Sequence, residues 1–235
     1  MDEVWDRVRP AGDVVLSGTP LLVVLGAAVV VVGVRPLWSV LRLGVTLVHE
    51  LGHAAVGIVA GRRFTGFVLR GDMSGHAVTV GPPRGFGRVA TTWAGYPAPA
   101  VAGAAAVWLG AHGWGGAVLA AVVVVLVAAL VRARSVLTAV VVLAVGGATA
   151  WLWWDGTQLA RAQVLVGVGI VLVVGAWRHL GAVTASRDGG SDAAVLARLT
   201  RVPGALWLVT FAVVCAAATW LVADVVLAAR AAGAT

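Results

Sequence analysis

Residues 89–131 read VATTWAGYPAPAVAGAAAVWLGAHGWGGAVLAAVVVVLVAALV and contain no Asp, Glu, Lys or Arg in 43 positions. A helix needs about 20 apolar residues to cross the hydrocarbon core of a bilayer, so this run is long enough for two crossings. The GWGG cluster at residues 113–116 is typical of a turn, because glycine adopts backbone conformations that other residues avoid. The run therefore predicts a helical hairpin that crosses a membrane twice.

The rest of the chain repeats this pattern. Further apolar runs with few charges bring the number of predicted membrane-spanning helices to about seven, and they cover residues 14–34, 37–60, 135–154, 162–177 and 203–229. The whole chain is 60% hydrophobic and 11% charged, with a mean hydropathy of +0.98, whereas soluble domains contain about 25% charged residues. This composition excludes a soluble globular, disordered, collagen-like or disulfide-rich protein. It predicts an all-α, polytopic membrane protein in which residues 1–235 form a single integral membrane domain.

All seventeen basic residues are arginines, and they lie singly between the apolar runs instead of forming a patch that would bind nucleic acid. Cytoplasmic connections of membrane proteins retain Lys and Arg. When successive connections are assigned to alternate faces, thirteen arginines fall on one face and three on the other, and the seventeenth, Arg42, lies inside the run 37–60. The count predicts a multi-pass protein of the cell membrane with a cytoplasmic N-terminus and a C-terminus outside. Its expected surroundings are the lipid bilayer, with no nucleic-acid partner.

The segment 61–88, on the predicted cytoplasmic face, differs from the apolar runs. Phe64–Leu69 and His76–Val80 are rich in β-branched and aromatic residues, and the GDMSG sequence at residues 71–75 between them has turn composition. The pattern predicts a small β-hairpin after the second membrane helix. A plain loop is the alternative.

Only two glutamates are present, and one of them, Glu50, lies inside the apolar run 37–60. It stands in the sequence HELGH at residues 49–53, which is an H-E-x-x-H motif. Residues four apart share one face of a helix, so His49 and His53 can bind one metal ion while Glu50 reaches a water bound to that ion. An acidic side chain in hydrocarbon costs roughly 2.5 kcal/mol or more, which a bound cation offsets. The motif predicts a zinc hydrolase site.

With these features the chain resembles the site-2 protease family of intramembrane zinc metallopeptidases, and more closely its small bacterial members without soluble domains. The resemblance rests on the HELGH motif in a membrane helix, the hairpin-like segment after it, the GYPAP break at residues 95–99 and a downstream aspartate motif. It implies that His49 and His53 bind Zn²⁺, that Glu50 is the general base, and that a downstream aspartate is the third ligand.

Two aspartates in the predicted cytoplasmic segment 178–203 match the family's third ligand in part. Asp188 is followed by glycine, as is usual in the family, but is preceded by Arg187 where an apolar residue is usual. Asp192 follows Ser191 at the start of an amphipathic helical turn and is similar to the small bacterial members. Asp192 is favoured, because a helix N-terminus can orient a carboxylate, and Asp188 is the alternative.

The predicted function is hydrolysis of peptide bonds in membrane-spanning protein substrates. A substrate helix has to unwind before its peptide bonds can be cleaved. The breaks at Gly95 and Pro97 could open a path for water and substrate to the metal. The hairpin could bind the unwound segment as an added strand through Phe67 and Val78. Two other functions stay open. One is a non-catalytic membrane protein in which a structural metal or a polar cluster holds helices together, and the other is an ion transporter.

Overall fold

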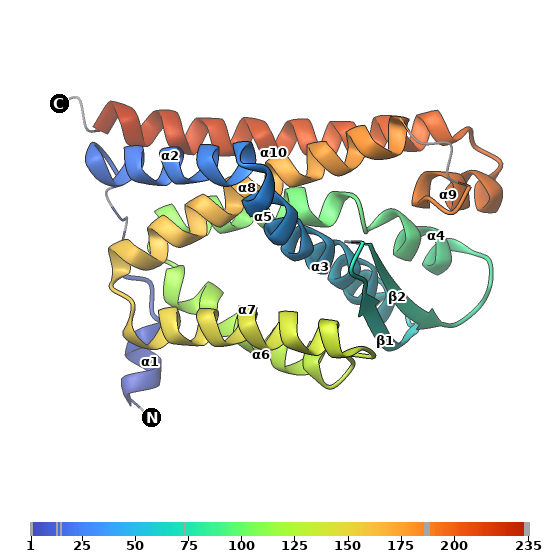
Figure 1. Ribbon diagram of the computed structural model, residues 1–235, viewed down its shortest axis with the longest axis horizontal. Coiled ribbons are helices and arrows are strands. Elements are labelled where there is room, and N and C mark those ends of the chain that lie inside the picture. Colours follow the sequence, from blue (N-terminus) through green and yellow to red (C-terminus); the bar gives the residue numbers. More distant parts are fainter. Residues whose placement is uncertain (1, 13, 15, 73, 186–188, 233–235) are drawn as a thin grey trace.

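The computed structural model describes residues 2–12, 14, 16–72, 74–185 and 189–232 (Figure 1). The chain is mostly helical, at 76%, and contains one small antiparallel sheet. In chain order the elements are α1 (Asp2–Val8), α2 (Thr19–Gly33), α3 (Arg35–Val59), β1 (Arg63–Leu69), β2 (Gly75–Val80), α4 (Phe86–Trp93), α5 (Pro97–Ala111), α6 (Gly115–Leu130), α7 (Val136–Asp155), α8 (Gln158–Ala185), α9 (Asp192–Thr200) and α10 (Gly204–Ala232).

Fewer helices than expected are long enough to cross a membrane. In the described part of the chain three qualify, namely α7, α8 and α10, with 20, 28 and 29 residues. Helices α2 and α3 meet at a bend of 97° and add a fourth span only if the pair counts as one broken span. Helices α5 and α6 have only 15 and 16 residues. The prediction of about seven spans is not confirmed, because α2, α5 and α6 have only 15, 15 and 16 residues, whereas a crossing needs about 20.

The segment that precedes α2 lies against the ends of α5 and α10. The N–H of Ala11 donates to the carbonyl of Gly113, between α5 and α6. Val14 lines one cavity together with Ala232, at the end of α10. The prediction that the two termini lie on opposite faces of the membrane stays a prediction. It counted α2 and α3 as two crossings, whereas these helices meet at a bend of 97°.

The predicted β-hairpin is confirmed. Strands β1 and β2 pair antiparallel, with Phe67 opposite Ala77. The other edge of β1 is occupied: the N–H of Phe67 donates to the carbonyl of Arg132, and the carbonyl of Phe67 accepts from the N–H of Arg134, both at 3.1 Å. Within the described residues, β2 pairs with no strand other than β1. Among the described residues the hairpin therefore has one edge that no strand occupies, which is the free edge of β2.

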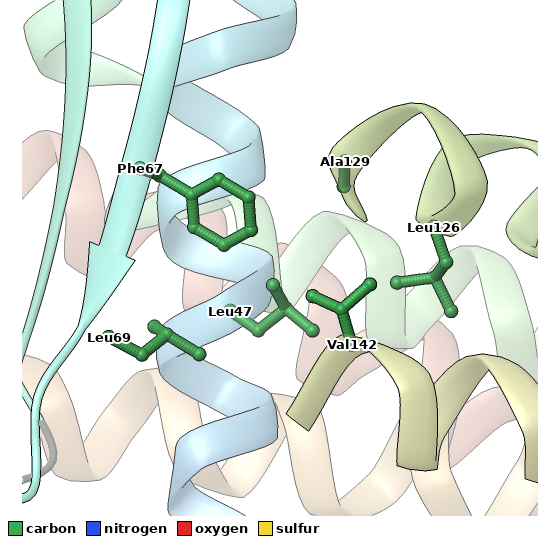
Figure 2. Close-up of a cluster of buried hydrophobic side chains, with 6 residues drawn as sticks. All are labelled: Leu47, Phe67, Leu69, Leu126, Ala129 and Val142. Atoms are coloured by element: carbon green, nitrogen blue, oxygen red, sulfur yellow. The ribbon is translucent and has the colours of Figure 1, made fainter. Parts of the chain in front are cut away.

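Two apolar clusters fix the elements that surround the H-E-x-x-H helix. The first packs one face of the hairpin against α3, α6 and α7, and consists of Leu47, Phe67, Leu69, Leu126, Ala129 and Val142 (Figure 2). The second packs α9 against α8 and α10, and consists of Leu180, Val183, Ala193, Leu196 and Phe211. Helix α3 is thereby held next to the hairpin, and α9 is held in a fixed position by α8 and α10.

Candidate metal centre

The two histidines of the motif come together on one face of α3. This helix is unbroken from Arg35 to Val59, so residues 49 and 53 lie one turn apart. The Nε2 atoms of His49 and His53 are 3.1 Å apart. Their rings lie at 85° to each other with centroids 4.8 Å apart. The two nitrogens that can bind a metal therefore meet at one place.

Asp192 completes a three-residue group from a distant part of the chain. It is the first residue of α9, and the side chain of Ser191 caps this helix by accepting from the N–H of Ala194. Its Oδ2 lies 3.4 Å from Nε2 of His49 and 3.3 Å from Nε2 of His53. Asp188, the alternative third ligand, lies outside the described residues.

These three atoms fit a zinc ion. Tetrahedral zinc with ligand bonds of about 2.0–2.1 Å places its ligand atoms about 3.3–3.4 Å apart, and the three separations here are 3.1, 3.3 and 3.4 Å. The Oδ2 atom of Asp192 is buried and makes no hydrogen bond of normal geometry within the described part of the chain. Such an atom is costly unless a cation binds it. Three protein ligands leave a fourth position open, as in catalytic zinc sites.

The charge of Asp192 suits this role. Burial raises the pKa of the Asp192 carboxyl, but the imidazoles of His49 and His53 outweigh burial and hold this pKa well below its ordinary value. The carboxyl is therefore ionised at neutral pH. Its place in the first turn of α9 favours the ionised form further, because a helix N-terminus carries partial positive charge.

The ring of His53 is held from behind by α4. Its Nδ1 lies 2.7 Å from the carbonyl oxygen of Thr91, which can accept only if Nδ1 carries the proton. That tautomer leaves Nε2 with the lone pair that a metal requires. Thr91 belongs to the helix that follows the hairpin, so the fold after the motif contributes to the orientation of the motif.

Glu50 lies beside the start of β2. Its side chain is buried, and a Cβ added to Gly75 would lie 2.6 Å from its Oε1 and 2.9 Å from Cγ2 of Thr46. Only glycine allows the strand to come this close. The sequence suggested only a turn role for Gly75, because nothing in the local pattern shows which helix the turn will contact.

The four residues expected to bind a substrate differ in how deeply they are buried. Phe67 is fully buried in the cluster of Figure 2, and its role in substrate binding stays a prediction. Val78 is half-buried on β2. Gly95 and Pro97 are buried, and Gly95 forms part of the wall behind the two imidazoles.

Two aromatic side chains beside His49 were not predicted as part of the site. The ring centroid of Tyr96 lies 5.0 Å from that of His49, and the ring of His179 lies 6.3 Å away. Their distance from the motif along the sequence shows no helical period, and their position beside His49 depends on how α5 and α8 pack against α3. Neither residue could therefore be assigned to the site from the sequence.

Gly95→Ala is expected to weaken zinc binding at least about tenfold. Loss of an outer-shell partner of a ligand already lowers metal affinity by about 10–100-fold, and displacement of the ligand itself should lower it at least as much. A Cβ at this position would lie 2.5 Å from Cε1 of His53 and 2.6 Å from Nε2 of His49, so the imidazoles would have to move. Zinc affinity is measured by competition with a chelator. Gly44→Ala in α3 is the matched control, since no atom lies within 4 Å of its added Cβ. Unchanged affinity in Gly95→Ala would contradict the placement of the centre.

Comparison with known proteins gives one match. The chain matches the family model described as Peptidase M50B-like over residues 21–222, which include the motif, the hairpin and Asp192. No curated protein and no solved structure matches the chain significantly.

Proposed function

The chain belongs to the Peptidase M50B-like family, the site-2 protease family, and on this basis we propose that it is an intramembrane zinc endopeptidase that cleaves membrane-spanning proteins. The observation that carries the proposal is the convergence of His49, His53 and Asp192 on one point next to the buried Glu50. The apolar helices and the family support a membrane location, and we propose the cell membrane. The direct test is cleavage of membrane-spanning reporters by zinc-loaded protein in vesicles, with loss of cleavage on chelation.

The residues of the centre have two roles in the proposed reaction, metal binding and proton transfer. Zinc held by His49, His53 and Asp192 would supply a Lewis acid that acidifies water and polarises the scissile carbonyl. Glu50 accepts the proton of the attacking water and returns it to the leaving amine nitrogen. Its Oε2 is buried and has no hydrogen-bond partner among the described residues, so it can take up a proton without losing an existing bond.

The free edge of β2 is the proposed binding place for the unwound substrate. The opposite edge of the sheet is occupied by residues 132–134, whereas β2 starts against Glu50 at Gly75. A substrate segment that pairs with β2 would therefore be held next to the proposed base. Main-chain pairing of this kind accepts many sequences, because it uses backbone groups that every residue has.

A cysteine at His76, which is exposed on β2, is expected to form a disulfide with a cysteine placed near the scissile bond of a reporter. Directly opposed residues of paired antiparallel strands have Cα atoms about 4.5–5.5 Å apart, which lies within the range of about 4.4–6.8 Å that a disulfide spans. Arg63→Cys, which is exposed on β1, is the matched control and should not cross-link. Both are made in a Cys215→Ala background, since Cys215 is the chain's one cysteine. Equal cross-linking from the two strands would contradict binding at β2.

A further inference from the structure

The two histidines of the metal centre differ in how the far side of each ring is held. His53 donates its Nδ1–H to the carbonyl of Thr91. The Nδ1 of His49 is buried and has no hydrogen-bond partner among the described residues. Metal-binding histidines almost always donate this second ring N–H to a carboxylate, a carbonyl or a water, which fixes the ring for the metal. His49 therefore lacks a direct acceptor that His53 has.

One imidazole that the proposed reaction does not use lies beside His49. His179, on α8, has its ring centroid 6.3 Å from that of His49, with the ring planes at 68°. It is half-buried, and its ring makes no hydrogen bond to another described residue. One of its nitrogens is therefore available as an acceptor.

Helix packing fixes His179 in this position. One turn earlier, α8 touches α3 so closely that a Cβ added to Gly175 would lie 2.6 Å from Cγ2 of Val45. His179 follows Gly175 by four residues, and His49 follows Val45 by four residues. Side chains four residues apart lie on the same helix face, so the two imidazoles continue the contact between the helices. The pairing of these rings follows from the backbone of both helices and does not depend on a flexible loop.

We propose that His179 is a positioning residue for the metal centre: its imidazole accepts the Nδ1–H of His49 through one bridging water and so orients His49 for zinc. At this separation the two rings are too far apart for a direct hydrogen bond, and one water spans the gap. The proposal rests on the proposed function only in taking the centre to bind zinc. It assigns His179 no contact with the substrate.

His179→Ala in the full-length protein is expected to weaken zinc affinity about 10–100-fold, the usual cost of losing an outer-shell partner of a ligand. His179→Gln should restore most of this loss, because its amide oxygen can accept the same bond. At saturating zinc, kcat of His179→Ala should return close to that of the wild type. Affinity is measured by chelator competition, and thermal unfolding verifies that each variant is folded.

One control variant distinguishes this role from a general effect of removing a polar ring. His112→Ala removes a histidine near the opposite end of the bundle, where its Nδ1 bonds to the carbonyl of Trp108, and should leave zinc affinity unchanged. Wild-type affinity in His179→Ala, or a kcat that stays low at saturating zinc, would overturn the proposal. Failure of the wild type to bind zinc would overturn the proposed function with it.

Discussion

Glu50→Gln is expected to abolish peptide hydrolysis and to leave zinc bound. Glutamine keeps the size and shape of the side chain but cannot accept a proton from water, and general base catalysis contributes about 10²–10⁴-fold to rate. The carboxyl of Glu50 does not belong to the group formed by His49, His53 and Asp192, so the metal ligands remain. The measurement is cleavage of a membrane-spanning reporter in vesicles together with the zinc content of the same preparation.

The chain provides a matched control for this variant. Glu3 is its only other glutamate and pairs with Arg7 on an exposed helix, so Glu3→Gln should cleave the reporter at the wild-type rate. His49→Ala should lose zinc and activity together. Full activity in Glu50→Gln would contradict the proposed mechanism and would favour a centre that only holds helices together. Loss of zinc in Glu50→Gln would instead place Glu50 among the ligands.

Local spacing was sufficient to predict two parts of the structure. The pairing of His49 with His53 follows from the pitch of a single helix, because the two residues are four apart and nothing between them interrupts α3. The hairpin follows from alternating β-branched residues around a glycine-rich turn, and β1 and β2 begin and end within one residue of the predicted segments. Both features depend on neighbours in the sequence.

The number of spans was not predictable in the same way. Counting apolar runs does not show how long each helix is, whereas α2, α5 and α6 have only 15, 15 and 16 residues. A count of apolar runs also does not show the angle between successive helices, and α2 and α3 meet at 97°. Composition therefore identifies a membrane protein but does not determine how often the chain crosses.

Contacts between distant elements were the least accessible from sequence. Three residues have roles that depend on which element packs against them. Gly75 lies against Glu50, Gly95 lies against the imidazoles of His49 and His53, and His179 lies beside His49. A glycine shows no periodicity that would distinguish a turn from a close approach. These residues could be identified only after the packing of α3 against β2, α5 and α8 was known.

Asp192→Ala is expected to lose zinc, with an affinity loss greater than the about 10–100-fold cost of losing an outer-shell partner. The variant removes one of three ligands and the only carboxylate in the group, so two neutral imidazoles would have to hold a divalent cation. Ala193 and Leu196, which pack α9 against its neighbours, are unchanged, so the helix should stay in place. Zinc content and reporter cleavage should fall together.

Asp188→Ala is the matched comparison, because it removes a carboxylate four residues earlier in the same segment. It should retain zinc and cleavage if Asp192 is the third ligand. The reverse result, with zinc lost in Asp188→Ala and kept in Asp192→Ala, would show that the ion pairs of Asp192 with His49 and His53 stabilise α9 without binding metal. The two outcomes separate a ligand from a neighbour, because only a ligand must be present for zinc to bind, whereas a structural ion pair can be lost while zinc still binds.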